Sequence, residues 1–400
     1  MVHSAPPAFH VLAKPRGAVC NLACKYCFYL EKSSLYEESS FRMSDQVLES
    51  YLRQVIKGHS VPEVTIAWQG GEPLLMGLEF FRRSIELERK HARPGTRIVN
   101  TIQTNGTLLD GEWCEFFREN DFLVGISLDG PRELHDSFRR DAKGGPTFER
   151  VMAGLRLLQK HKVEHNALTT VNSANADHPR EVYHFLRDEA GFQFIQFIPV
   201  VERTKGELGQ RTNKVTEATV RPGQYGRFMI GVFDEWVKRD VGEVFVQSFD
   251  TALANWYGEP PAVCVSSPVC GTALALEHNG DLYSCDHFVD PGHLLGNILE
   301  KEMVEMIGSD QQRRFGLEKA HLPRCCMECE VRFACHGGCP KDRFSRTPEG
   351  EGLNYLCAGY KSFYHHIDRP MRIMCDLLRQ GRAPSEIVHH NEKQATKKGR

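Results

Sequence analysis

The first 240 residues alternate between short β-branched runs and longer amphipathic stretches, and this alternation limits the possible folds more than any other feature. Runs rich in Val, Ile and Thr indicate strands, whereas the stretches between them repeat apolar residues with the period of a helix. Strands joined by helices run parallel, with right-handed crossovers. We expect strands at 10–14, 64–68, 97–103, 122–128, 164–171 and 193–199, and helices at 44–57, with Ser44 as N-cap, 78–91, 147–160 and 179–189.

Polar and glycine residues follow the expected strands. QGGEP (69–73) comes after the second strand, TNG (104–106) after the third and DGP (129–131) after the fourth. The carboxyl ends of parallel strands share one edge, and α/β barrels place their active sites there. The sequence therefore predicts an α/β fold, an open or closed barrel of six β-α units, with a reactive site at this edge.

The loop after the first strand, CNLACKYCFY, contains Cys20, Cys24 and Cys27. Structural zinc takes four protein ligands, so three neighbouring thiols indicate either a distant fourth ligand or a metal centre with one open position. The spacing alone leaves both interpretations open.

The chain contains 14 cysteines, and their clustering favours metal binding over disulfides. The first residues lack the apolar segment of a signal peptide, and no apolar run is long enough to span a bilayer, so we expect a cytoplasmic protein with reduced thiols. The net charge of -2 and the pI of 6.8 offer no basic field for a nucleic-acid backbone. We therefore expect neither a nucleic-acid nor a membrane partner. Cys114 and Cys375 are expected to pack in the core.

From about residue 241 the pattern changes to cysteines, turns and a few short strands. LALEHNGDLYSCDHF predicts a hairpin whose Asn279-Gly280 pair suits a type I′ turn, with Cys285 on the returning strand. The end of the chain has no apolar period. We expect a barrel over 1–240, a smaller cysteine-rich α+β domain over 241–382 and a disordered tail over 383–400.

The CxxxCxΦC motif, with Tyr26 before its third cysteine, and GGEP after the second strand together resemble the radical S-adenosylmethionine (SAM) superfamily. The resemblance implies a partial (β/α)6 barrel in which the three thiols hold a 4Fe-4S cluster whose open iron binds SAM. One electron would then cleave SAM into methionine and a 5′-deoxyadenosyl radical. The residues implied to line the methionine amino group are Gly70, Gly71 and Glu72.

Eight later cysteines have the spacings C-x5-C-x14-C and C-x2-C-x5-C-x3-C-x17-C. Two zinc sites of four thiolates each would also use all eight. The arrangement resembles the SPASM-type extension of radical SAM enzymes, which implies two further 4Fe-4S clusters, with Gly337 and Gly338 directing backbone N–H groups to cluster sulfurs. The implied ligands are Cys264, Cys270, Cys285 and Cys339 for one cluster, and Cys326, Cys329, Cys335 and Cys357 for the other.

The motifs GAVCNLACKYCFYLEK, WQGGEPLL, QTNGTLL, ISLDGP, YSCDHF and CHGGCPKDR, in this order, resemble the anaerobic sulfatase-maturating enzymes. The resemblance implies oxidation of a Cys or Ser in a sulfatase Cys/Ser-x-Pro-x-Arg segment to Cα-formylglycine. The substrate would be an unfolded or locally extended sulfatase, and a flavodoxin- or ferredoxin-like protein would donate electrons. The implied SAM contacts are Tyr26, Gly71, Ser127, Arg139 and Val201, and the implied contacts of the target side chain are Tyr29 and Gln69.

Asp286 directly follows a cluster cysteine, where this family has its general base. An aspartate titrates near ~3.9 and a thiol near ~8.5, so direct proton transfer between them is uphill by roughly 6 kcal/mol. We expect burial to raise the pKa of Asp286 without closing this gap. The hypothesis is that hydrogen abstraction comes first and that Asp286 then takes the proton.

Two other functions fit these motifs. A radical SAM enzyme of the same architecture would modify another peptide, for example by a thioether crosslink, and the aspartate after Cys285 favours sulfatase maturation over it. From a different class, a zinc-stabilised binding protein without catalysis would use the same thiols. Iron content and colour distinguish a zinc-stabilised binding protein from a radical enzyme, since zinc sites are colourless.

Overall fold

The computed structural model describes residues 6–36, 39–206 and 211–388, and the chain divides into two compact units. The domain boundaries expected at residues 240 and 382 stay predictions, because these units group residues by proximity and interleave along the chain. The first unit comprises Met1–Ser127, Arg139–His165 and Val269–Glu318, and the second comprises Leu128–Phe138, Asn166–Pro268 and Lys319–Arg400.

The first unit is a sheet with helices. Its strands are β1 (His10–Lys14), β2 (Glu63–Trp68), β3 (Arg97–Thr104), β4 (Leu123–Ser127), β10 (Ala273–Glu277), β11 (Asp281–Tyr283) and β12 (Leu294–Asn297). Its α-helices are α1 (Asp45–Gly58), α2 (Leu78–His91), α3 (Gly111–Glu119), α5 (Phe148–Lys160), α9 (Met303–Ile307) and α10 (Asp310–Glu318). Shorter 3-10 turns are η1 (Leu30–Leu35), η2 (Pro73–Met76), η5 (Asp286–Phe288) and η6 (Pro291–His293).

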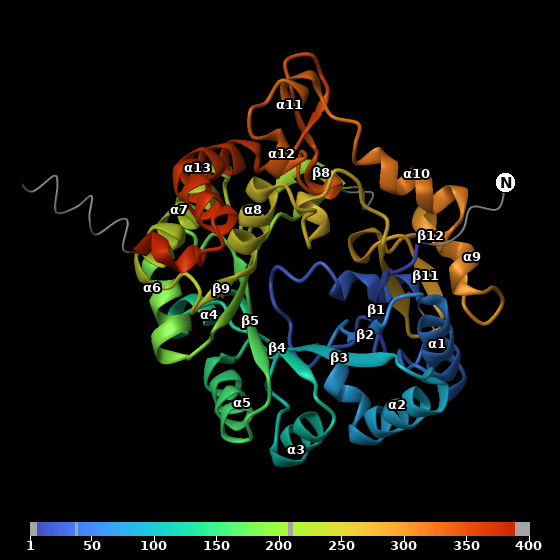
Figure 1. The fold of residues 1–400 in the computed structure, drawn as a ribbon. Coiled ribbons are helices and arrows are strands. Elements are labelled where there is room, and N and C mark those ends of the chain that lie inside the picture. Colours follow the sequence, from blue (N-terminus) through green and yellow to red (C-terminus); the bar gives the residue numbers. More distant parts are fainter. Residues whose placement is uncertain (1–5, 37–38, 207–210, 389–400) are drawn as a thin grey trace, which may run out of the picture. The chain divides into compact units, whose positions relative to one another are not determined.

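The strands of this unit lie in the order β12-β11-β10-β1-β2-β3-β4 (Figure 1). β1 to β4 run parallel, β10 pairs in parallel with β1, and β11 and β12 continue the sheet antiparallel. The side chain of Ser44 accepts a hydrogen bond from Val47 N and caps α1, as expected. Trp68 on β2 meets Tyr51 and Phe81 edge to face, with ring centres 5.6 and 5.7 Å apart, so aromatic packing joins the sheet to α1 and α2.

The hairpin of β10 and β11 differs from its prediction in two respects. Its strands are connected by three residues, 278–280. Gly280 has a φ of 95°, but Asn279 lies outside the left-handed region, so the turn is not type I′, which needs positive φ at both central residues. Cys285 lies beyond the end of β11, directly before η5, and not on the returning strand.

The parallel pairing of β1 with β10 sets Lys14 opposite Glu277. Both strands therefore end at the same edge of the sheet. The loop with Cys20, Cys24 and Cys27 follows β1 and begins beside this edge. β11 runs back from the edge, with Tyr283 opposite Ala275, and the segment with Cys285 follows β11.

The second unit has β5 (His165–Val171), β6 (Phe194–Pro199) and β9 (Phe245–Val246), which pair in parallel in this order. Two small antiparallel pairs are β7 (Arg203–Lys205) with β8 (Arg211–Val215), and β13 (Ser345–Arg346) with β14 (Gly352–Leu353). Its α-helices are α4 (Arg132–Phe138), α6 (Pro179–His184), α7 (Pro222–Arg239), α8 (Gln247–Tyr257), α11 (Arg324–Met327), α12 (Arg332–Cys335) and α13 (Cys357–Arg379). The π-helical turn η3 (Phe185–Glu189) continues α6, and 3-10 turns are η4 (Cys264–Ser266), η7 (Pro340–Asp342) and η8 (Pro384–Glu386).

All six expected barrel strands form, each within one residue of its predicted ends. The helix expected at 179–189 is divided into α6 and the π-helical η3. The expected tail begins too early, because η8 is ordered and Ile387 after it is fully buried. The prediction of disorder is thus wrong for 383–388, and residues 389–400 lie outside the described part.

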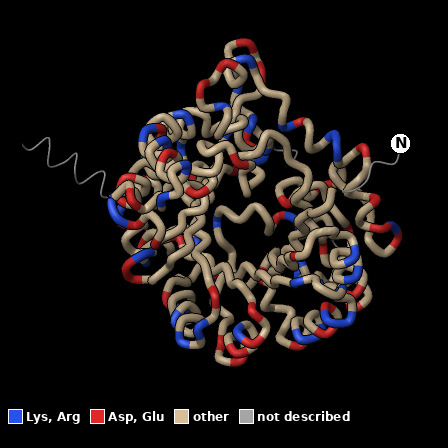
Figure 2. The backbone as a smooth tube through the Cα atoms, viewed as in Figure 1, with Lys and Arg blue, Asp and Glu red and all other residues tan. Residues whose placement is uncertain are grey.

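Charged residues of both signs are interleaved along the helices of each unit (Figure 2). The 50 basic and 52 acidic residues are therefore mixed along the chain and not separated into blocks. Among the described residues, no helix combines the length and apolar character that crossing a bilayer requires.

Candidate active site

The loop after β1 brings the first three predicted cluster ligands together. The charges of Cys24 and Cys27 act on Cys20, so the three thiols lie within short electrostatic range. Burial raises the pKa of Cys20 to about 12, and the neighbouring thiols add to this rise. The Leu22 N–H donates to the Cys20 sulfur at 3.3 Å and opposes the rise. A bound metal would stabilise these thiols as thiolates.

The GGEP segment packs directly against this loop. Gly71 N donates to Gly17 O at 2.8 Å, and Glu72 N donates to Val19 O at 2.9 Å. A Cβ on Gly71 would lie 2.0 Å from Val19 O, which is closer than any allowed contact. Glycine at position 71 is therefore required by the approach of two backbone segments.

Glu72 is fully buried, and its carboxylate accepts hydrogen bonds from neutral donors. One oxygen accepts from Leu74 N at 3.0 Å and Thr104 Oγ1 at 2.8 Å, and the other accepts from Asn105 N at 2.8 Å. Burial raises the pKa of Glu72 to about 7, although these bonds lower it. The Asn105 side-chain amide also donates to the Cys20 sulfur at 3.7 Å. Glu72 thus fixes a segment that contacts a predicted cluster ligand.

Two predicted SAM contacts, Tyr26 and Arg139, lie side by side and are buried. The guanidinium carbon of Arg139 is 5.5 Å from the centre of the Tyr26 ring, a distance at which the ring face attracts a cation. A third predicted contact, Ser127 at the end of β4, accepts from the Gln103 side-chain amide at 3.1 Å. These three residues belong to the first unit.

Lys14, the last residue of β1, gathers the predicted catalytic and substrate-binding residues. Its Nζ lies 2.5 Å from Asp286 Oδ1, 2.9 Å from Gln69 Oε1 and 4.6 Å from the centre of the Tyr29 ring. The Lys14 side chain is only 2% exposed. The structure thus brings all three predicted residues around one buried ammonium group.

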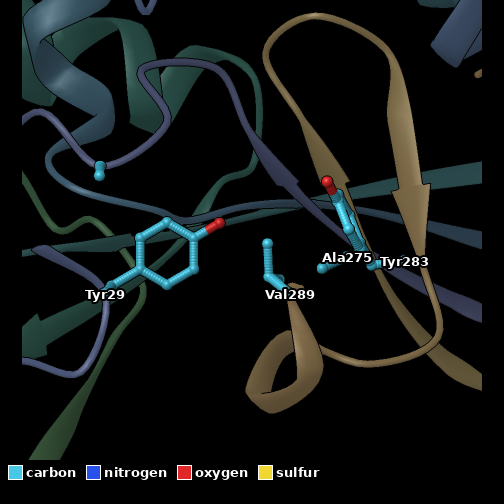
Figure 3. Packing of buried hydrophobic residues seen from close by; sticks show 5 residues of the cluster. Tyr29, Ala275, Tyr283 and Val289 are labelled. Carbon is cyan, nitrogen blue, oxygen red and sulfur yellow. The ribbon is translucent and has the colours of Figure 1, made fainter. Parts of the chain in front are cut away.

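Tyr29 is buried between the cysteine loop and the hairpin. Figure 3 shows its ring beside Val289, with the hydroxyl directed toward the hairpin strands. The hydroxyl donates to Glu277. Burial, together with the charges of Glu277 and Asp286, raises the pKa of Tyr29 well above its ordinary value, so the hydroxyl stays protonated.

The ionisation of Asp286 contradicts the expectation that its pKa would be raised. Burial alone would raise it, but the charges of Lys14, His287 and Lys32 outweigh burial and hold the pKa of Asp286 below its usual value. The gap to an intact thiol is therefore wider than expected. Sequence reasoning missed Lys14, and its signal was a lysine that ends a buried apolar strand, HVLAK.

Cys270 and Cys285, two implied ligands of the second cluster, belong to the first unit. Cys270 N donates to Gly316 O at 3.1 Å, and a Cβ on Gly316 would lie 2.2 Å from Cys270 O. Gln312 donates at 2.6 and 3.1 Å to the carbonyl groups adjacent in sequence to these two cysteines. Helix α10 therefore holds both cysteine segments.

Cys264 and Cys339, the other two implied ligands of that cluster, belong to the second unit. Burial raises the pKa of Cys339 to about 12, and the charge of Cys264 contributes to the rise. Lys341 forms an ion pair with Asp342 at 2.9 Å and donates to the Val201 carbonyl at 3.1 Å. The predicted SAM contact Val201 is thus held by a lysine of the Cys339 loop.

The four implied ligands of the third cluster gather within the second unit. Burial raises the pKa of Cys326 to about 12 and that of Cys335 to about 11, and the charges of neighbouring cysteines add to both. The N–H groups of Gly337 and Gly338 donate to Cys335 and oppose the rise of its pKa. The thiols linked by these effects are Cys326, Cys329, Cys335 and Cys357, together with Cys325, whose charge is the largest contribution from any cysteine at Cys326 and Cys357.

In the described ranges, no three His, Cys, Asp or Glu side chains are arranged to hold a single metal ion. The thiols in the Cys20 loop and around Cys335 receive hydrogen bonds from backbone N–H groups, an environment that suits iron-sulfur clusters. Cys114 and Cys375 are 0% and 1% exposed, which confirms that both pack in the core.

Comparisons with known proteins define the class of this chain. Residues 15–186 match the radical SAM superfamily, and residues 264–330 match SPASM, an iron-sulfur cluster-binding domain. The chain is a radical SAM protein with a partial (β/α)6 barrel followed by a smaller cysteine-rich auxiliary-cluster domain.

The similar proteins narrow this class. The chain is 48% identical to the serine-type anaerobic sulfatase-maturating enzyme of Bacteroides thetaiotaomicron, over 95% of this chain and 94% of that enzyme. It is 36% identical to the cysteine-type enzyme of Clostridium perfringens, over 90% and 96% of the two chains. It matches the solved structure of native anSMEcpe with bound AdoMet and Kp18Cys peptide with a TM-score of 0.82 and 34% identity, over 92% and 99% of the two chains. The chain belongs to the anaerobic sulfatase-maturating enzymes.

Proposed function

We propose that this protein oxidises a serine or cysteine in a sulfatase Cys/Ser-x-Pro-x-Arg segment to Cα-formylglycine. The observation that carries the proposal is the convergence of Gln69, Tyr29 and Asp286 on Lys14, at the edge where the three-thiol loop begins. The reaction class is supported by the enzymes to which the chain is similar. Serine is the first target to test, because the relative at 48% identity is serine-type, whereas relatives of both types are found at 36% identity.

The residues of this chain that would hold the cofactors are those predicted from the motifs. When bound, SAM and three 4Fe-4S clusters supply a radical that takes a hydrogen atom from the target Cβ and an acceptor for the electron left behind. The proposed ligands of the SAM-binding cluster are Cys20, Cys24 and Cys27, and the proposed SAM contacts are Tyr26, Gly70, Gly71, Glu72, Ser127, Arg139 and Val201. The two auxiliary clusters would use the later cysteines in the two sets of four given above.

The proposed role of Gln69, Tyr29 and Asp286 is to orient the target and accept its proton. Gln69 turns its Oε1 toward Lys14, so its Nε2 is the group that would donate to the target hydroxyl or thiol. Asp286 would take the proton from that hydroxyl or thiol. Because the pKa of Asp286 is low, proton transfer becomes favourable only after loss of the Cβ hydrogen has acidified the target.

The proposed reaction balances as a two-electron oxidation. One hydrogen atom leaves Cβ, one proton passes to Asp286 and one further electron is removed. A serine then becomes the aldehyde directly. A cysteine becomes a thioaldehyde, which water hydrolyses to the aldehyde with release of hydrogen sulfide.

We test the proposal by anaerobic incubation with SAM, dithionite and sulfatase peptides that contain Ser or Cys, read by mass spectrometry. Loss of two hydrogens from the Ser peptide, or conversion of the Cys peptide to the same aldehyde, is the expected result. A crosslinked peptide would favour a different radical modification. A colourless protein that contains zinc and no iron would remove the enzyme proposal altogether.

We further propose that the substrate is an unfolded or locally extended sulfatase and that a flavodoxin- or ferredoxin-like protein donates electrons in the cytoplasm. None of the fourteen cysteines, all of which lie in the described residues, forms a disulfide, and this suits a reducing compartment. A short peptide should react faster than folded sulfatase, and equal rates would contradict the requirement for an extended substrate. Replacement of dithionite by flavodoxin with its reductase should sustain turnover.

A further inference from the structure

Lys14 is a buried cation whose ammonium group contacts Asp286, Gln69 and Tyr29 of the proposed site. A buried ammonium group is strongly disfavoured unless it is paired and hydrogen-bonded. Its Nζ satisfies this requirement with the Asp286 carboxylate at 2.5 Å and the Gln69 carbonyl at 2.9 Å, above the Tyr29 ring at 4.6 Å. Burial of the Lys14 ammonium group therefore depends on these three contacts.

The three partners of Lys14 come from three different segments. Gln69 follows β2, Tyr29 lies in the loop after β1, and Asp286 opens the turn after the hairpin. Lys14 itself is held by the pairing of β1 with both β2 and β10. Gln69 N donates to Ala13 O at 2.9 Å, so the backbone joins the Gln69 segment to β1 beside Lys14. The Lys14 side chain adds the contacts that link these two segments to Tyr29 and Asp286.

We propose that Lys14 is the positioning residue that fixes the Asp286 carboxylate and the Gln69 amide on the target side chain. This inference rests on the proposed function. By binding one oxygen of Asp286, Lys14 leaves the other oxygen to face the target. By binding Gln69 Oε1, it sets the direction in which the amide N–H groups point.

The inference is tested by removing the contact and retaining the size of the side chain. Lys14→Met should keep the iron content and the electron paramagnetic resonance spectrum of the reduced clusters. Its yield of formylglycine per 5′-deoxyadenosine should fall by about 100-fold, because a displaced acceptor no longer meets the target proton. Lys14→Arg, which keeps the charge, should recover activity to within about tenfold of wild type.

A second lysine provides the matched control. Lys32 donates to the Val289 carbonyl at 2.6 Å, and its charge also acts on Asp286. Lys32→Met removes this charge and the bond to the Val289 carbonyl but leaves Lys14 in contact with Asp286 and Gln69, so the product ratio should change by less than about threefold. An equal loss in both methionine variants would mean that charge alone matters, and the positioning role would be wrong.

A double-mutant cycle separates positioning from general damage to the fold. If Lys14 acts through Asp286, then Lys14→Met combined with Asp286→Asn should have the same product ratio as Asp286→Asn, within about threefold. If the two substitutions lower the product ratio independently, so that their losses multiply in the double variant, the inference is wrong. It is also wrong if Lys14→Met keeps the wild-type yield of formylglycine per 5′-deoxyadenosine.

The stability of wild type, the two single variants and the double variant provides a readout that does not depend on turnover. The effects of the two substitutions on the unfolding equilibrium should be non-additive by at least about threefold, because each removes the same ion pair. Additive effects contradict the inference whether or not the enzyme is active. If the effects on stability are non-additive but wild type makes no formylglycine, the proposed function is wrong. The contact between Lys14 and Asp286 then only stabilises the fold, and the positioning role is wrong as well.

Discussion

Two carboxylates of the first unit lie beside predicted cluster ligands, Glu72 fully buried and Asp286 with its side chain 15% exposed, and their proton affinities differ. Asp286 lies 2.5 Å from the Lys14 ammonium, and its pKa is below the ordinary value. Glu72 accepts bonds from two backbone N–H groups and the Thr104 hydroxyl, and its pKa is raised to about 7. Burial disfavours charge in both, so the cation accounts for the difference.

This comparison separates a carboxylate that is able to accept the target proton from one that fixes a segment of the proposed SAM site. Neutral donors satisfy the oxygens of Glu72 but do not offset the cost of its charge. A cation offsets that cost, so Asp286 stays ionised and is able to accept a proton. Sequence position does not distinguish the two residues, because each lies in a loop after a strand.

The largest expected effect is that of Asp286→Asn. The amide cannot accept the proton, so formylglycine formation should fall by about 1,000-fold, whereas 5′-deoxyadenosine should still form with substrate peptide. Liquid chromatography and mass spectrometry measure both products. Asp290→Asn, in the same loop, should retain both. Loss of both products in a folded Asp286→Asn variant with intact clusters would contradict the order of steps.

The next largest effect is expected for Gly71→Ala, which displaces the segment that carries Glu72. Its Cβ would lie 2.0 Å from Val19 O, so the free energy of unfolding should fall by about 3 kcal/mol. Gly111→Ala is the control, because a Cβ there meets nothing within 4 Å. Similar thermal unfolding midpoints for the two variants would refute the close-approach argument.

Glu72→Gln tests whether Glu72 stabilises its segment without accepting the target proton. The new NH2 group would face backbone and hydroxyl donors, so the free energy of unfolding should fall by about 2 kcal/mol. The ratio of formylglycine to 5′-deoxyadenosine should stay at the wild-type value, because Glu72 does not accept the target proton. A ratio as low as that of Asp286→Asn would erase the distinction between the two carboxylates.

The smallest expected effect is a pH dependence from Glu88, a buried carboxylate with neutral donors. Ser84 Oγ donates to it at 2.9 Å and Asn100 Nδ2 at 2.7 Å, and burial raises its pKa to about 7. A raised folded-state pKa gives stability that is complete below the unfolded value of ~4.5 and is lost as pH rises through about 7. The free energy of unfolding should therefore fall by about 1 kcal/mol from about pH 6 to about pH 7.5.

Glu88→Gln checks this pH dependence. The variant should have a flatter profile of unfolding midpoint against pH than wild type over this interval. Asp286 should behave in the opposite way, since a lowered pKa gives stability that is lost only as pH falls into the acid range. An unchanged slope in Glu88→Gln would assign the pH dependence to other groups.

The barrel strands were predictable because they follow from local patterns. The apolar period of a strand or helix is contained in a few turns, and all six predicted strands form within one residue of their ends. The hairpin was predictable as a hairpin, but its turn type was not, because Asn279 does not adopt the positive φ that its sequence permits. The ordered end at Ile387 was missed, because a single buried residue has no period.

The sequence by itself determined which thiols, glycines and loops this protein has, since spacing within a loop limits what its side chains can reach together. The tertiary structure alone decided which carboxylate is charged. Lys14 meets Asp286 because β1 pairs with β10, and no local pattern encodes the pairing of strands so distant in sequence. The charge on a buried group depends on what other segments bring to it, and that is set only when the chain is folded.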